Sequence, residues 1–125
     1  MGIKLDMIGI VVKDMKKALD FYRLLGLVIP AEADGEKHVE VEQGAFRLAF
    51  DQQEVIRDVY GTWEEPTGHR IELAFLCDSG AAVDELYRKI TETGEGGFRE
   101  PWDAFWGQRY AIVQDPDGNR ISLFA

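Results

Sequence analysis

The chain has 125 residues, the size of one ordinary domain, and folding at that length buries roughly two thirds of the surface that the unfolded chain exposes. Its formal net charge is −9, from 14 Lys and Arg against 23 Asp and Glu, which excludes the basic surface that nucleic-acid binders need. Apolar runs are short, and none approaches the roughly 20 residues of a membrane-spanning helix. We therefore expect one soluble domain with no nucleic-acid partner and no membrane partner.

The charge and the cysteine content also bear on the ligand and the cellular compartment. An acidic field of this size favours encounter with cationic small molecules, although many soluble proteins are acidic without such a function. Cys77 is the single cysteine and lies in an apolar run, so we interpret it as a buried, inert thiol. Residues 1–6 lack the apolar stretch of a signal peptide. These features favour a cytoplasmic protein.

The first predicted strand and helix, within residues 8–22, recur as residues 73–87 at an offset of 65 residues. Both copies consist of an apolar strand, a capping residue and a helix with one apolar face. The aligned pairs are Asp14 and Ser79, Tyr22 and Tyr87, and Arg23 and Arg88. Asp14 and Ser79 are good N-cap residues, and Gly26 and Gly94 provide helix stops. We expect both tyrosines to lie in the core.

Short alternating segments follow each helix and predict strands. In the first half they are residues 27–31, 37–42 and 45–51, and in the second half they lie around Phe98 and over 108–114 and 119–124. Asp115–Asn119, with the sequence Asp-Pro-Asp-Gly-Asn, predicts a tight turn before the last strand. The fold class is therefore α+β, with two tandem βαβββ modules, 1–51 and 69–125, joined by a connector 52–68 that the sequence does not assign.

The order of these pieces resembles one known family. The repeat, the Phe21-Tyr22 helix leading to Leu25-Gly26, and the closing segment Trp106–Asn119 together resemble the vicinal-oxygen-chelate superfamily of glyoxalase I, extradiol dioxygenases and bleomycin-resistance proteins. The resemblance covers nearly the whole chain. It implies two cupped sheets, with helices on the convex sides and concave sides around a cavity that holds metal and substrate. A fold alone does not fix the reaction.

Strand alternation predicts which side chains enter such a cavity. The rows expected on the convex side are Ile8, Ile10 and Val12; Phe46, Leu48 and Phe50; Ile71, Leu73, Phe75 and Cys77; and Ile121 and Leu123. Metal-dependent members of the family take His, Gln and Glu ligands from up to four concave positions. The resemblance places these positions at Met7, Arg47, Glu72 and Ser122, and Met7 and Glu72 also share the 65-residue offset.

This set predicts that the metal site is lost and that no cofactor is bound. Of the four residues, Glu72 alone is a good ligand for a hard or borderline cation, whereas a catalytic ion needs about three protein ligands. His38 and His69 lack a metal-binding spacing, and we interpret them as surface or hydrogen-bonding histidines. Asp6 adjoins the first position, but alternation predicts that it points to the other face.

Two features remain as candidate ligand contacts. Arg47 and Glu72 are expected in the same cavity, where they either neutralise each other or orient a polar ligand. The resemblance also places an aromatic segment near the ligand crevice of metal-free, antibiotic-binding members, and here it contains Trp102, Phe105 and Trp106. These rings either form a stacking surface for a ligand or seal the cavity mouth or a dimer contact.

The resulting hypothesis is a metal-free small-molecule-binding protein that sequesters an antibiotic-like compound or a metabolite and has no catalytic residue. The ligand-binding candidates are Met7, Arg47, Glu72, Trp102, Phe105, Trp106 and Ser122. The first alternative is a glyoxalase-like or dioxygenase-like enzyme in which Glu72 acts with non-standard ligands or in metal-free acid–base chemistry. The second is a non-enzymatic module that binds a protein partner. The family resemblance also implies a homodimer.

Overall fold

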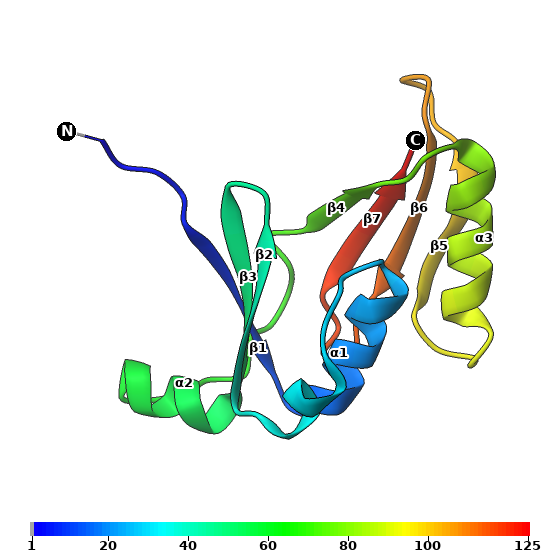
Figure 1. The fold of residues 1–125 in the computed structure, drawn as a ribbon. Coiled ribbons are helices and arrows are strands. Elements are labelled where there is room, and N and C mark those ends of the chain that lie inside the picture. Colours follow the sequence, from blue (N-terminus) through cyan, green and yellow to red (C-terminus); the bar gives the residue numbers. More distant parts are fainter. Residues whose placement is uncertain (1) are drawn as a thin grey trace. The chain divides into compact units, whose positions relative to one another are not determined.

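A computed structural model describes residues 2–125, which form two mixed β-sheets, three α-helices and a short 3-10 helix (Figure 1). The α+β fold class expected from the sequence is confirmed. The residues divide into two compact units. Unit 1 runs up to Arg23 and continues over Leu27–Pro66, and unit 2 contains Leu24–Gly26 and Thr67–Ala125. No helix within residues 2–125 is long and apolar enough to cross a lipid bilayer.

Unit 1 is built on a three-stranded sheet in the order β1-β3-β2. The first strand, β1 (Met7–Val12), pairs parallel with β3 (Phe46–Gln52), and β2 (His38–Gln43) pairs antiparallel with β3. Ile10 and Val12 are buried, as the alternation predicted. The first and last strands of the unit are therefore neighbours, which requires the intervening helix to cross over the sheet.

Helix α1 (Met15–Leu24) begins and packs as the sequence predicts. The Asp14 carboxylate accepts a hydrogen bond from the backbone N–H of Lys17 at 3.1 Å, which satisfies one free donor of the first turn. Tyr22 is fully buried, and its ring centroid lies 4.9 Å from that of Phe50 on β3. This contact attaches the helix to the convex face of the sheet.

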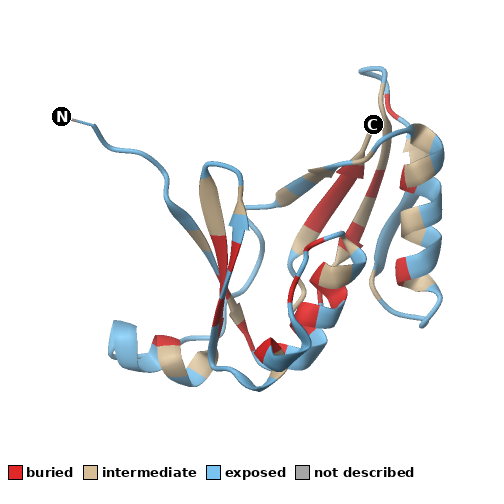
Figure 2. Cartoon of the chain, viewed as in Figure 1, coloured by how far each residue is buried: buried red, intermediate tan, exposed pale blue. Residues whose placement is uncertain are grey.

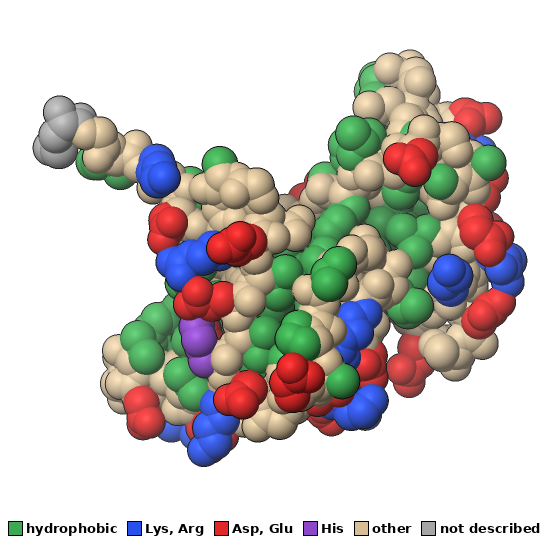
Figure 3. All heavy atoms as spheres, in the orientation of Figure 1, with side chains coloured by type: hydrophobic (Ala, Val, Ile, Leu, Met, Phe, Trp, Pro, Cys, Tyr) green, Lys and Arg blue, Asp and Glu red, His purple; other side chains and the backbone are tan. Residues whose placement is uncertain are grey.

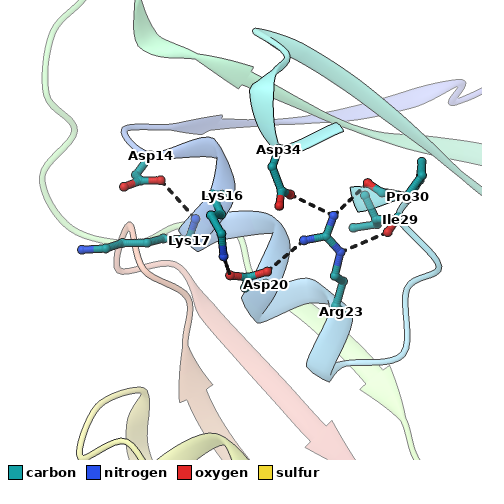
Figure 4. Close-up of polar contacts among 8 residues, drawn as sticks. All are labelled: Asp14, Lys16, Lys17, Asp20, Arg23, Ile29, Pro30 and Asp34. Carbon is teal, nitrogen blue, oxygen red and sulfur yellow. Dashed lines mark hydrogen bonds and ion pairs between the residues drawn. The ribbon is translucent and has the colours of Figure 1, made fainter. Parts of the chain in front are cut away.

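The strand expected at residues 27–31 is not formed, and Arg23 explains why. Residues 27–30 are irregular and Ala31–Gly35 form the 3-10 helix. The Arg23 guanidinium donates to the carbonyl oxygens of Ile29 and Pro30 at 3.0 and 2.9 Å (Figure 4). It also pairs with Asp20 and Asp34 at 2.8 and 2.9 Å. The carbonyl groups that a strand partner would need are therefore bound by a side chain.

The connector contains a helix that the sequence did not assign. Helix α2 (Gln53–Tyr60) starts directly after β3 and ends at Gly61, whose φ of 82° is the left-handed conformation typical of a helix C-terminus. Ile56 is the buried residue of this helix, while Val59 and Tyr60 are exposed. Figure 2 accordingly shows α2 as mostly exposed.

Unit 2 repeats the same pairing scheme with one more strand. Its sheet has the order β4-β7-β6-β5, with β4 (Leu73–Leu76) parallel to β7 (Arg120–Phe124). The other pairs are antiparallel and join β6 (Arg109–Gln114) to β7 and to β5 (Gly97–Asp103). In both units the first strand lies parallel to the last strand, which supports the repeat found in the sequence.

Helix α3 (Gly80–Thr91) covers the convex face of this sheet, where it contacts β5, β6 and β7. The Ser79 hydroxyl accepts from the Ala82 N–H at 3.1 Å, so the predicted N-cap is confirmed. Buried residues concentrate along the middle of β6 and β7 (Figure 2). The fully buried apolar residues of this unit are Val83, Ala111, Val113, Ile121 and Leu123.

Other local features of unit 2 confirm some expectations and correct others. The turn at Asp115 forms as predicted, because its carboxylate accepts from the N–H groups of Asp117 and Asn119 and Gly118 has a φ of 89°. Ile71 is 83% exposed, so its expected packing on the convex side is wrong. Ile71 precedes β4, and alternation does not extend beyond the paired strand.

Cys77 is half-buried rather than buried, and burial raises the pKa of its thiol.

Candidate functional site

Each sheet has a second face, opposite its helix, and the strand register defines its members. In unit 1 three rows of paired residues run across the sheet. They are Met7, Arg47 and Glu42; Gly9, Ala49 and Glu40; and Val11, Asp51 and His38. The face therefore carries charged side chains from both β2 and β3, close enough to interact across strands.

Five residues of unit 1 form an ionic chain, which we define as Asp6, Arg47, Glu40, His38 and Asp51. Arg47 donates to the carboxylates of Asp6 and Glu40 at 2.6 and 2.5 Å. His38 contacts Glu40 through Nε2 at 2.8 Å and Asp51 through Nδ1 at 2.5 Å. Acidic, basic and histidine side chains lie next to one another on this surface in Figure 3. Each cationic group in the chain lies between two carboxylates.

The charges within the ionic chain shift the pKa values of its members in the direction expected for ion pairs. The neighbouring carboxylates of Glu40 and then Asp51 raise the pKa of His38 above its ordinary value of 6.5. The His38 ring and, after it, the Arg47 guanidinium lower the pKa of Glu40. The prediction that His38 is a hydrogen-bonding histidine is confirmed. Sequence analysis did not identify the ionic chain, although alternation places His38, Glu40 and Glu42 on one face of β2.

The expected orientation of Asp6 is wrong. Strand β1 begins at Met7, so Asp6 lies just before the strand and alternation does not apply to it. Its backbone oxygen accepts from the Arg47 N–H at 2.8 Å, and its carboxylate accepts from the Arg47 guanidinium. Asp6 therefore contacts the same side chain as the residues of the concave face.

The four positions that correspond to the family's metal ligands meet in two pairs. Met7 lies directly opposite Arg47 in unit 1. In unit 2 the hydroxyl of Ser122, which is fully buried, donates to the Glu72 carboxylate at 3.4 Å. The observed ion-pair partners of Arg47 are residues of its own unit, and the expected pairing of Arg47 with Glu72, which belongs to the other unit, stays a prediction.

These residues do not fit a catalytic metal ion. Arg47 brings a guanidinium, held by two carboxylates, to a ligand position, and a cation repels a cation. Ser122 offers a neutral hydroxyl that is already engaged with Glu72. Within residues 2–125 no three His, Cys, Asp or Glu side chains are grouped so that they could hold a metal ion. The donor set leaves one carboxylate where about three protein ligands are needed.

The concave face of unit 2 carries a row of aromatic rings, which we call the aromatic cluster: Trp102, Phe105, Trp106, Tyr110 and Phe124. The register places Trp102 opposite Tyr110 and Tyr110 opposite Phe124, so three adjacent strands each contribute one ring. Ring centroids lie 5.3 Å apart between Trp102 and Tyr110 and 6.1 Å apart between Tyr110 and Phe124. These are the separations of favourable aromatic pairs.

The hairpin between β5 and β6 supplies the other two rings. The backbone turns back at Ala104, whose oxygen accepts from the Gly107 N–H at 2.9 Å. Trp106 contacts Phe105 and Tyr110 with centroid distances of 5.0 and 5.3 Å, and its indole N–H donates to Gln108. Phe105 is 97% exposed and Trp106 is 48% exposed. The structure thus brings together the three predicted aromatic residues and adds Tyr110 and Phe124, which sequence analysis did not name as ligand contacts.

Two arginines contact aromatic rings of this sheet, and sequence analysis did not name them. The guanidinium carbon of Arg99 lies 3.5 Å from the centroid of Trp102, and that of Arg120 lies 3.6 Å from the centroid of Phe98. Both distances are typical of cation–π contacts. Within the described residues 2–125 neither guanidinium forms an ion pair or hydrogen bond, and the buried Nε of Arg120 has no acceptor.

Comparisons with known proteins give the chain a family and a fold. The family model of the Glyoxalase/Bleomycin resistance protein/Dioxygenase superfamily matches residues 4–123. The uncharacterized protein YraH of Bacillus subtilis is 26% identical over 125 residues, which cover 98% of each chain. Both findings extend over nearly the whole sequence.

Solved structures agree at the level of the fold. A glyoxalase/bleomycin resistance protein/dioxygenase family enzyme from Burkholderia phytofirmans matches with a TM-score of 0.82 at 19% identity, covering 98% of each chain. The hypothetical protein SA1046 of S. aureus matches with a TM-score of 0.81 at 21% identity, covering all of this chain and 94% of its own. At these identities the likeness concerns the fold and not the reaction.

Proposed function

The chain belongs to the Glyoxalase/Bleomycin resistance protein/Dioxygenase superfamily, and on that premise we propose that it binds a planar aromatic small molecule on the aromatic cluster of unit 2. In this proposal the protein sequesters the compound and does not transform it, and no metal takes part. The homodimer and the cytoplasmic location expected from the sequence stay predictions.

The observation that carries the proposal is the continuous row of ring contacts from Phe105 to Phe124, part of which is exposed. Rings that merely filled a core would be hidden from solvent, whereas Trp106 is 48% exposed and Phe105 almost completely so. Large aromatic side chains lose little conformational entropy on binding and offer extensive apolar area, which makes them strong anchors. The row is therefore suited to stacking against a flat ligand.

The chemistry of the family's ligand positions supports binding without metal-dependent catalysis. Arg47 and Ser122 occupy two of these positions, and both are engaged with carboxylates of their own unit. Glu72, at a third position, is exposed and contacts the Ser122 hydroxyl, which does not ionise near neutral pH. Removing Glu72 should therefore leave binding of a neutral aromatic compound unchanged.

A ligand panel tests the proposal. Planar aromatic compounds should raise the melting temperature, because a ligand that binds the native state alone stabilises it by RT ln(1 + [L]/Kd). They should also quench tryptophan fluorescence. Trp102→Ala should weaken binding by about 1–3 kcal/mol, as expected for loss of an aromatic anchor. Trp63→Ala is the matched control, because Trp63 lies in the connector of unit 1 and outside the aromatic cluster.

Two outcomes would contradict the proposal. One is that no compound of a broad antibiotic and metabolite panel shifts the melting curve or quenches fluorescence. The other is that the protein turns over a hemithioacetal or a catechol and loses this activity in Glu72→Gln. The second result would replace sequestration with an enzymatic function.

A further inference from the structure

We propose that Arg120 is the anchor of an anion subsite on the same sheet face as the aromatic cluster, and that the compound bound there is a planar aromatic acid. This inference rests on the proposed function, because it assumes that the rings hold the ligand, and it adds the ligand's charge. The expected ligand class is therefore an aromatic ring system that carries a carboxylate.

The first argument is the unsatisfied donor of Arg120. Its Nε is buried and has no acceptor among residues 2–125, whereas buried polar groups in folded proteins are nearly always hydrogen-bonded. The guanidinium carbon of Arg120 lies 3.6 Å from the centroid of the Phe98 ring. A guanidinium presents its N–H groups as a planar fork that matches a carboxylate. Arg120 is thus held in place with donors still to be satisfied.

The second argument is that no carboxylate of unit 2 occupies this fork. Arg88 and Arg109, in the same unit, are both bound by carboxylates. Glu72 accepts instead from the hydroxyl of Ser122 and forms no ion pair with Arg120. A partly buried arginine without a carboxylate partner leaves a position for an anion from outside.

The third argument is the position of Arg120 relative to the rings. Arg120, Ser122 and Phe124 alternate along β7 and therefore point to the same face. The Cα atoms of Arg120 and Phe124 are about 13 Å apart at the usual rise of about 3.3 Å per residue. The Arg120 guanidinium lies over Phe98 of β5, the strand that also carries Trp102, so a bicyclic ring system with a carboxylate can extend from the guanidinium toward the rings. Gln114, opposite Arg120 on β6, adds an amide that can donate to the second oxygen of the acid.

Two probes with the same ring system separate the contribution of the ligand's charge to binding from that of its rings. Calorimetric titration with 2-naphthoate and with its neutral amide, 2-naphthamide, should show that the acid binds about ten-fold more tightly or better, the scale expected for charge-assisted hydrogen bonds. Arg120→Gln should reduce naphthoate binding to the level of the amide and leave the amide unchanged. Arg120→Lys, which keeps the charge without the planar fork, should give an intermediate affinity.

Lys89→Gln is the matched control. It changes the net charge by the same amount, but Lys89 is an exposed residue of α3, which covers the opposite side of the sheet, so naphthoate affinity should be preserved. Circular dichroism of each variant verifies the fold. The comparison of the two probes on the unmodified protein needs no variant, so a folding defect in Arg120→Gln does not prevent the test.

The outcomes distinguish this inference from the function on which it rests. Equal binding of acid and amide, or naphthoate binding that is unaffected in Arg120→Gln, would overturn the anion subsite and leave the aromatic site standing. Absence of binding for both probes, together with failure of the wider panel, would overturn both.

Discussion

The two sheets of this protein carry different chemistry on the faces that their helices leave uncovered. In unit 1, Arg47 lies between the carboxylates of Asp6 and Glu40, and His38 lies between Glu40 and Asp51. In unit 2 the corresponding face carries a row of aromatic rings, and the guanidinium groups of Arg99 and Arg120 contact the rings of Trp102 and Phe98 and, within residues 2–125, no carboxylate. The members of the ionic chain pair with one another, whereas Arg99 and Arg120 on the face of unit 2 have no carboxylate partner among the described residues. This difference is why we place the ligand on unit 2.

The helices show the same divergence at equivalent positions of the repeat. Tyr22 is fully buried against Phe50, while Tyr87 at the matching position is half-buried. Arg23 binds two loop carbonyls and two carboxylates, while Arg88 binds Glu85 and Glu92 of its own helix. A repeat can therefore retain an element and its position while each side chain acquires a different role.

The largest expected effect tests the two tyrosines. Tyr22→Ala should lower the free energy of unfolding by about 3–5 kcal/mol, as for other large aromatic residues removed from a core. Tyr87→Ala should cost less, because its side chain is already partly hydrated in the folded state. Urea denaturation of both variants measures the difference. Equal losses would show that the two halves are energetically equivalent despite their different burial.

A smaller effect is expected at the paired arginines. Arg23→Met removes hydrogen bonds to the oxygens of Ile29 and Pro30 and leaves Asp34 without its cation, so we expect a loss of about 2 kcal/mol. Arg88→Met removes exposed pairs on the surface of α3 and should cost clearly less. Thermal unfolding of both variants provides the comparison. If Arg88→Met were the more destabilising change, the structural role assigned to Arg23 would be wrong.

Much of the fold could be predicted because its signals are local. The caps at Asp14 and Ser79, the turn at Asp115 and the alternation within strands each depend on a few neighbouring residues. The strand expected at residues 27–31 failed because a side chain elsewhere, Arg23, binds the carbonyls of that segment. No periodicity within the segment itself carries that information.

The candidate site was predicted less completely, because its contacts depend on the register between strands. Trp102, Phe105 and Trp106 are close in sequence, so their grouping was visible. Tyr110 and Phe124 join them only through the pairing of β5, β6 and β7. That Arg120 has no carboxylate partner can be seen only when the ion-pair partners of the neighbouring charged residues are known. The sequence does not give these partners.

The smallest expected effect concerns the ionic chain of unit 1 and its dependence on pH. His38 lies between Glu40 on β2 and Asp51 on β3, and Glu40 in turn contacts Arg47. The two carboxylates raise the pKa of His38 above 6.5 in the folded state. A raised folded pKa means that the native state binds the proton more tightly than the unfolded chain does. The resulting stabilisation is fully present below the unfolded pKa of about 6.5 and is lost as the pH rises through the folded value.

The urea midpoint of the unmodified protein should therefore fall as the pH rises from about 6.5 through the raised pKa of His38. His38→Gln should flatten this part of the profile, because glutamine keeps a donor for Asp51 without a titrating proton. His69→Gln is the matched control, since His69 is exposed and lies outside the ionic chain. The effect should be modest, because the His38 side chain is 46% exposed and solvent screens its charge. A profile that retains its slope in His38→Gln would show that the ionic chain contributes no pH-dependent stability, and the contrast between the two sheet faces would then rest on unit 2 alone.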